Sequence, residues 1–226
     1  MASTVRVPAP IGQRALLITT LAVPLTGWTV HALALHRKLS AARRDPLTGL
    51  LGRDGYTAKA RQITDRYGDA ALVVLVDLDH FKAINDGPGG HAAGDRVLAV
   101  TAARLTAWAG SRGAVGRLGG DEFAVAVRIG PARRELRLTQ LTQLLAQPVE
   151  VEDGVLVDVA ASVGAASPDV LGTTDLSALQ RAADAAMYAG KHTGRPVLAG
   201  PQHATVPSTN GRRAGRPGTH TLGRAA

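Results

Sequence analysis

The chain of 226 residues contains no cysteine and very few aromatic side chains. Without cysteine, disulfides and thiolate metal sites are excluded. Aromatic residues make up 3% of the chain, too few for the stacking surface that binding of single-stranded nucleic acid needs. At this length the chain has room for one domain of ordinary size with flanking segments.

Acidic residues are missing from both ends of the chain, and the formal net charge of +8 comes from those ends. Residues 1–44 hold six Lys or Arg and no acid, and residues 200–226 hold four Arg and no acid. The remaining 16 basic and 18 acidic residues leave the middle of the chain at −2. Because the folded part is not basic, we expect no specific nucleic-acid partner.

One uncharged stretch, residues 15–35, has about the length of a membrane span. Three interpretations stay open: a single transmembrane helix, a long helix that packs on the domain or pairs two chains, and a cleaved signal peptide. Basic residues between 36 and 44 outnumber those between 1 and 14, which favours a cytoplasmic C-terminal side. We expect a single-pass protein of the inner (cytoplasmic) membrane, with a soluble cytoplasmic protein as the alternative.

Helical and strand patterns alternate through the middle of the chain. The patterns predict helices near 53–67, 92–108, 132–146 and 175–190, and strands near 71–77, 113–118, 122–128 and 155–166. Such alternation is typical of an α/β fold with helices packed on a central sheet. After residue 200 the chain has almost no apolar content, so we expect a disordered tail.

Two acidic segments stand beside predicted strands. Asp77 ends an apolar run, and Asp121 and Glu122 follow a Gly119-Gly120 turn between two short strands. Carboxylates at a strand end and at a hairpin tip can converge on one divalent ion, and such oxygen ligands suit Mg²⁺ or Mn²⁺. Glycines without a Cβ also let a phosphate or a base approach the backbone.

Five motifs occur in a recognisable order. They are Asp45–Arg53 (DPLTGLLGR), Asp77–Asp86 (DLDHFKAIND), His91–Asp95 (HAAGD), Gly119–Phe123 (GGDEF) and Ala186–Arg195 (AMYAGKHTGR). Together they resemble the GGDEF family, the diguanylate cyclases, over residues 45–197. The resemblance implies a palm-like, mostly antiparallel central sheet flanked by helices, as in nucleotidyl cyclases. We expect this α/β domain to be preceded by an N-terminal helix.

The resemblance also implies the roles of the site residues. For catalysis it names Asp121 and Glu122, whose roles as general base and metal ligand the sequence does not separate. For the metal, Mg²⁺ or Mn²⁺, it names Asp77, the carbonyl of Leu78, Asp121 and Glu122. For the substrate it names Phe81, Lys82, Lys191 and Arg195 near the phosphates, Asn85 and Asp95 at guanine, and the two glycines Gly119 and Gly120. The spacer at residues 87–90 is one residue longer than is usual in the family.

These expectations describe a membrane-associated diguanylate cyclase that condenses two GTP molecules into cyclic di-GMP and two pyrophosphates. Because one domain holds one GTP, the enzyme is expected to act as a homodimer. The alternative is a catalytically silent GGDEF domain that binds GTP or cyclic di-GMP as an effector. The expected organisation is a tail (1–14), a transmembrane or long packing helix (15–35), a basic linker helix (36–44), the GGDEF domain (45–199) and a disordered basic tail (200–226).

Overall fold

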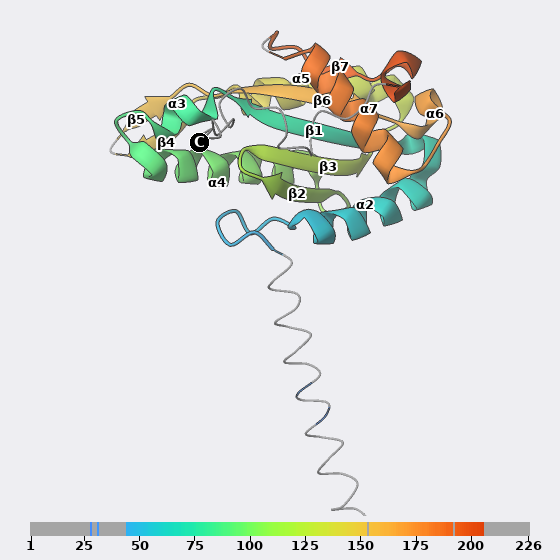
Figure 1. Ribbon diagram of the computed structural model, residues 1–226, viewed down its shortest axis with the longest axis horizontal. Coiled ribbons are helices and arrows are strands. Elements are labelled where there is room, and N and C mark those ends of the chain that lie inside the picture. Colours follow the sequence, from blue (N-terminus) through green and yellow to red (C-terminus); the bar gives the residue numbers. More distant parts are fainter. Residues whose placement is uncertain (1–27, 29–30, 32–43, 153, 192, 206–226) are drawn as a thin grey trace, which may run out of the picture. The chain divides into compact units, whose positions relative to one another are not determined.

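The computed structural model describes residues 28, 31, 44–152, 154–191 and 193–205. The chain divides into two compact units, residues 1–43 and 44–226. Nearly all described residues belong to the second unit, in which helices cover both faces of a central sheet (Figure 1). The expected α/β fold with a mostly antiparallel sheet is confirmed.

The central sheet has five strands in the order β2-β3-β1-β6-β7. These strands are β1 (Ala71–Asp79), β2 (Ala114–Gly119), β3 (Glu122–Arg128), β6 (Ala160–Ala166) and β7 (Val197–Leu198). All neighbours pair antiparallel except β6 and β7, which are parallel. The middle strand, β1, is an almost continuous apolar run because both of its faces are buried.

Four helices cover the sheet. α2 (Arg53–Tyr67) and α7 (Leu176–Ala189) pack on one face, and α4 (Gly90–Ala109) and α5 (Arg134–Leu145) pack on the other (Figure 1). All four predicted helices are therefore confirmed, with ends within two residues of the expected positions. Successive side chains of β1 point to opposite faces of the sheet, and each face has its own hydrophobic core. Asp77 lies an even number of residues after Val73 and Leu75, so its side chain points to the same face as theirs. Asp77 therefore lies on the face covered by α2 and α7.

The close contact between α7 and β6 depends on a glycine. A Cβ added to Gly164 would lie 2.1 Å from the carbonyl oxygen of Ala183 and 2.3 Å from the amide nitrogen of Met187. Both atoms belong to the helix backbone, which cannot move aside as a flexible side chain can. Glycine at this position therefore lets α7 cross the sheet closely, and its C-terminal end then lies near the end of β1.

Shorter elements complete the domain. They are η1 (Gly68–Ala70), α3 (Phe81–Asn85), η2 (Pro131–Arg133), β4 (Val149–Glu152), β5 (Val155–Val157), α6 (Pro168–Leu171) and η3 (Pro201–Thr205). The single strand expected at 155–166 is in fact two strands, because β5 pairs with β4 in a separate hairpin. η3 occupies the start of the segment expected to be disordered, whereas residues 206–226 lie outside the described residues.

The prediction of a single-pass membrane protein is wrong. In the part of the chain that the structure describes, no helix is both long and apolar enough to cross a membrane. The prediction relied on length and absence of charge, although four threonines, a proline, a glycine and a histidine dilute the apolar residues of segment 15–35. Apart from Trp28 and His31, that segment lies outside the described residues, as does most of the expected linker helix at 36–44.

Candidate functional site

The two acidic motifs meet at one end of the sheet. Asp77 near the end of β1 is the direct cross-strand partner of Glu122, the first residue of β3. Partners of this kind place their side chains on the same face, with Cβ atoms about 4.5–5.5 Å apart. Asp77 and Glu122 therefore face each other across two antiparallel strands, as the proposed metal site requires.

The hairpin tip is attached to the same strand end. The amide of Leu78 donates a hydrogen bond to the carbonyl of Asp121 at 3.3 Å. Because N–H and C=O of one residue in an antiparallel strand point to the same side, the Leu78 carbonyl also points toward the hairpin. Gly120 has a φ of +53°, a conformation that favours glycine, and it lets the chain turn at this point.

Several negatively charged side chains lie close enough to Glu122 to affect its pKa. Burial, and after it the negative charge of Asp77, raises the pKa of the Glu122 carboxyl above its ordinary value, while Arg53 acts in the opposite direction. Asp121 and Asp184 add further to the increase. The metal-free protein therefore holds a half-buried carboxylate at a position where negative charge is unfavourable.

This electrostatic cost predicts that removing the charge of Glu122 stabilises the metal-free protein. A carboxyl whose pKa is raised by folding stabilises the protein below its unfolded-state pKa, and this contribution is lost as pH rises through the folded-state pKa. In EDTA at pH 7–8, Glu122→Gln should therefore melt roughly 1–4 °C higher than wild type. The difference should disappear near pH 4.

Thermal unfolding followed by circular dichroism between pH 4 and 8 measures this effect. Glu150→Gln is the matched control, because Glu150 is exposed on β4 and the substitution is the same. The control should melt at the wild-type temperature throughout. An unchanged or lower melting temperature for Glu122→Gln at pH 7–8 would contradict the prediction.

A cation contacts one carboxylate of this pair. The ammonium of Lys191, just after the end of α7, lies 2.8 Å from Asp77 Oδ2, although the two residues are 114 positions apart. The hydrogen bond to Asp77 raises the pKa of Lys191, with further contributions from the charges of Asp77, Asp79 and Asp121 and with burial opposing. The tertiary structure thus brings Lys191 to the acidic end of β1.

The residues expected to read guanine lie where α3 meets α4. A Cβ added to Gly94 would lie 1.9 Å from Asn85 Oδ1 and 3.2 Å from Phe81 Cζ. Glycine at this position therefore makes room for both α3 side chains beside Asp95, the next residue of α4. The lengthened spacer does not separate the helices, since it closes on itself through backbone bonds from Gly90 to Gly87 (3.0 Å) and from Gly87 to Ile84 (3.3 Å).

Two other cations were expected to bind phosphate. Lys82 on α3 and Arg195 beyond α7 are both described and exposed. Neither forms a hydrogen bond or ion pair with Asp77, Asp121 or Glu122 in the described structure. Their assignment to phosphates therefore stays a prediction.

The sequence reasoning assigned no role to an ion pair behind the hairpin. Arg117 contacts Asp45 at 3.1 Å and also donates from Nε to the carbonyl of Gly120 at 2.9 Å. Burial alone would raise the pKa of Asp45, but hydrogen bonds from Thr48, followed by that from Arg117, lower it overall. Arg117 thereby ties the glycine turn to the loop that begins the domain. In the sequence, the position of Arg117 two residues before Gly119-Gly120 was the signal that could have indicated this role.

Two further charged residues near Glu122 were also missed. Arg53, in the first turn of α2, donates to the carbonyl of Leu118 at 3.0 Å and lowers the pKa of Glu122. Asp184, on α7, is only 2% exposed and acts in the opposite direction. Arg53 ends the first of the five motifs, whereas nothing in the sequence pattern of α7 distinguishes Asp184 from a surface acid.

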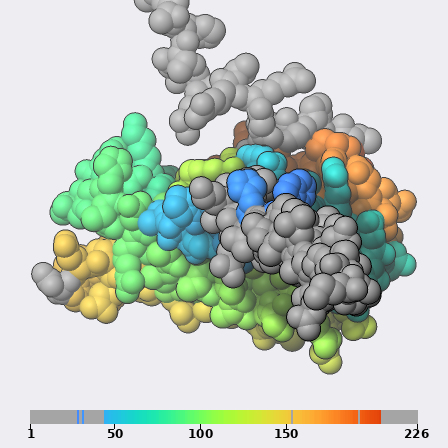
Figure 2. Space-filling view, turned by 90° about the horizontal axis from the view of Figure 1, so that it is seen from below, coloured from blue at the N-terminus to red at the C-terminus, as the bar shows by residue number. Residues whose placement is uncertain are grey.

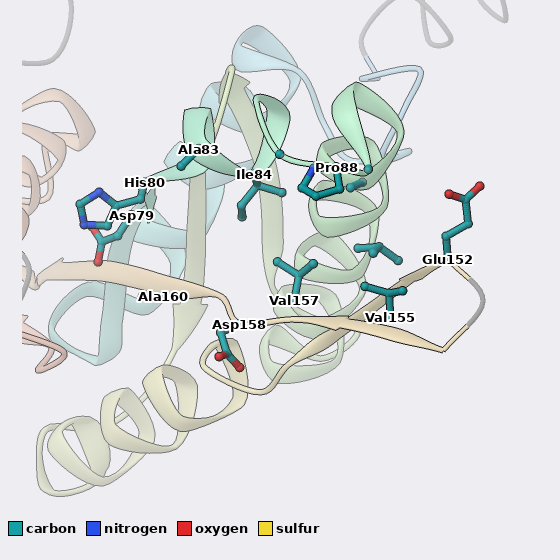
Figure 3. Close-up of a pocket in the computed structure, with 14 residues that line it drawn as sticks. Asp79, His80, Ala83, Ile84, Pro88, Glu152, Val155, Val157, Asp158 and Ala160 are labelled. Carbon is teal, nitrogen blue, oxygen red and sulfur yellow. The ribbon is translucent and has the colours of Figure 1, made fainter.

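A separate pocket lies beside α3. It has a volume of about 530 Å³ and lies between α3, the spacer before α4 and the β4–β5 hairpin. Val155 and Val157 point from the hairpin toward Ile84 and Pro88 (Figure 3). In the space-filling view, the segment around α3 (green) and the hairpin (yellow) are neighbouring lobes at one end of the domain (Figure 2). None of the residues predicted to bind substrate or metal lines this pocket.

The described residues do not contain a complete metal-binding cage. No group of three or more His, Cys, Asp or Glu side chains is arranged there to hold a metal ion. Mg²⁺ usually binds through one or two carboxylates and completes its shell with water and substrate phosphates. The paired carboxylates of Asp77 and Glu122, with the Leu78 carbonyl directed toward the hairpin, fit that kind of site.

Comparisons with known proteins show which family the chain matches. Residues 42–196 match the family described as "Diguanylate cyclase, GGDEF domain". A 19.3 kDa protein from the repSA 5′ region of Streptomyces ambofaciens, of uncharacterised function, is 50% identical over 76% of this chain and 91% of that protein. Diguanylate cyclase DgcN of Escherichia coli is 36% identical over 68% of this chain, but this match spans only 38% of DgcN.

Solved structures show the same fold. The GGDEF domain of TpbB (YfiN) from Pseudomonas aeruginosa matches with a TM-score of 0.63 and 32% identity, over 71% of this chain and 96% of that one. The coiled coil and GGDEF domain of DgcB from Caulobacter crescentus, solved in complex with c-di-GMP, matches with a TM-score of 0.63 and 26% identity, over 80% of this chain and 100% of that one. Together with the sequence matches, these structures support a role related to cyclic di-GMP. The chain belongs to the GGDEF domain family.

Proposed function

We propose that this protein is a diguanylate cyclase that condenses two GTP molecules into cyclic di-GMP and two pyrophosphates. The observation that supports this most directly is the pairing of Asp77 with Glu122 at one strand end. In each of two steps, a ribose 3′-oxygen bonds to an α-phosphorus, the bond from that phosphorus to the pyrophosphate oxygen breaks, and the hydroxyl proton is released.

The carboxylates would serve two purposes in this reaction. Asp77 and Glu122, with the Leu78 carbonyl, would hold a divalent cation, Mg²⁺ or Mn²⁺, which supplies Lewis acidity and neutralises phosphate charge when bound. Asp121 in the hairpin turn and Glu122 are the residues available to accept the 3′-hydroxyl proton.

The remaining predicted residues would position the nucleotide. Asn85 and Asp95 would accept and donate hydrogen bonds at the guanine edge. Lys82, Lys191 and Arg195 would neutralise the leaving pyrophosphate. Because the product joins two nucleotides through two equivalent bonds and each domain offers one such site, two chains must face each other, so the active form would be a homodimer.

Product analysis of the full chain tests the proposal. With GTP and Mg²⁺, chromatography should show cyclic di-GMP and two pyrophosphates for each dinucleotide. At low protein concentration the rate should rise faster than linearly, because two chains must meet. Asp121→Ala should lower the rate at least about 100-fold, while ATP should give little product. GTP that binds but stays unchanged would instead indicate the silent effector. A chain that makes no product and binds neither GTP nor cyclic di-GMP would have neither function.

A further inference from the structure

Lys191 contacts one oxygen of the Asp77 carboxylate, which the proposed function uses as a metal ligand. Its ammonium is 2.8 Å from Asp77 Oδ2, and the carboxylate and ammonium side chains are 15% and 37% exposed. In the nucleotide-free protein this one side chain therefore neutralises part of the charge that a divalent ion would otherwise neutralise.

A lysine and a divalent cation would compete for this carboxylate. Two positive groups about 4 Å apart repel each other strongly in a partly buried site, and the repulsion doubles for a divalent ion. A metal bound between Asp77 and Glu122 would therefore favour movement of the Lys191 ammonium away from Asp77. Its departure needs a new anionic partner, and a nucleotide triphosphate provides one.

Hydrogen bonds join the described residues on either side of Lys191 to the end of α7. The Lys191 amide donates to the carbonyl of Tyr188 at 3.2 Å, and Thr193 donates to the carbonyl of Gly190 from both its amide (3.0 Å) and its hydroxyl (2.7 Å). A Cβ on Gly190 would lie 2.6 Å from Val197 Cγ2, so the turn packs closely on β7. The flexible four-carbon stem of lysine can then carry the ammonium from one partner to another without backbone movement.

We propose that Lys191 is a place-holding cation that keeps free divalent metal out of the nucleotide-free site and releases Asp77 when the metal arrives with a nucleotide. The inference rests on the proposed function, because it takes the Asp77–Glu122 pair as the metal site. It adds an order of binding: metal and nucleoside triphosphate enter together, and metal alone binds weakly. Lys191 then weakens the binding of metal alone and strengthens the binding of the nucleoside triphosphate.

Binding of Mn²⁺ alone tests this directly. In full-length protein without nucleotide, electron paramagnetic resonance should show that Lys191→Met binds Mn²⁺ about tenfold more tightly than wild type. Lys191→Arg keeps a cation and should bind Mn²⁺ as weakly as wild type. With Mn²⁺ present, the non-hydrolysable analogue of GTP should bind about tenfold more weakly to Lys191→Met, because a phosphate contact is lost.

Two further variants make the result specific. Lys59→Met removes an exposed lysine of α2 and should leave Mn²⁺ binding unchanged. Asp77→Asn combined with Lys191→Met should abolish the gain in affinity, since that gain requires the Asp77 carboxylate. Equal or weaker Mn²⁺ binding by Lys191→Met, or no binding by any variant, would overturn the inference even if wild type makes cyclic di-GMP. If Lys191→Met binds Mn²⁺ more tightly but wild type makes no cyclic di-GMP, only the cyclase function is overturned.

Discussion

Replacing Asp77 by asparagine is expected to lower the rate of cyclic di-GMP formation at least about 100-fold. Asparagine keeps the size of the side chain but removes the charge that faces Glu122 across β1 and β3. Without that charge the site loses a ligand for the divalent ion and the partner of Lys191. The initial rate with GTP and saturating Mg²⁺, measured by product chromatography, gives the size of the effect.

Asp79→Asn is the matched control for this experiment. Asp79 lies two residues farther along the same strand, but its carboxylate is buried and accepts a hydrogen bond from the Ser162 hydroxyl at 2.8 Å. Asparagine can still accept that bond, so the control should keep activity within about tenfold of wild type. A loss in Asp77→Asn no greater than in Asp79→Asn would argue against Asp77 as a metal ligand.

Adding one methyl group at Gly94 is expected to impair GTP binding without harming the fold. The Cβ of Gly94→Ala would collide with Asn85 Oδ1 at 1.9 Å, and the end of this flexible side chain has to move away. The KM for GTP should rise about tenfold, because Asn85 no longer meets the guanine edge. Alanine is a better helix former than glycine, so the melting temperature should be unchanged or higher.

A double-mutant cycle separates this explanation from general damage. Asn85→Ala alone should raise the KM as Gly94→Ala does, and the two changes together should add little to either one. Ala103→Gly on the exposed side of α4 is the control for the helix, and it should lower stability slightly without changing the KM. Full additivity of the two changes would show that Gly94 does not act through Asn85.

Several parts of the fold followed from local patterns in the chain. The apolar run before Asp77 predicts a strand, and the glycine pair before Asp121 predicts a hairpin; both are present. The prediction of one continuous strand at 155–166 was wrong. β5 pairs with β4 and β6 pairs with β1, and the spacing of apolar residues does not reveal these separate partners. The membrane prediction failed because length and missing charge were given more weight than the diluted hydropathy of residues 15–35.

The sequence by itself determined the family, the α/β fold and the acidic motifs, because motif order and strand patterns are local properties of the chain. Only the tertiary structure decided which cation contacts Asp77, which arginine ties the hairpin to Asp45, and how α3 lies against Gly94. These contacts join residues far apart in the chain through side-chain reach, strand register and close backbone packing. None of those three quantities is encoded in a local pattern, so they emerge only when the sheet and its helices are assembled.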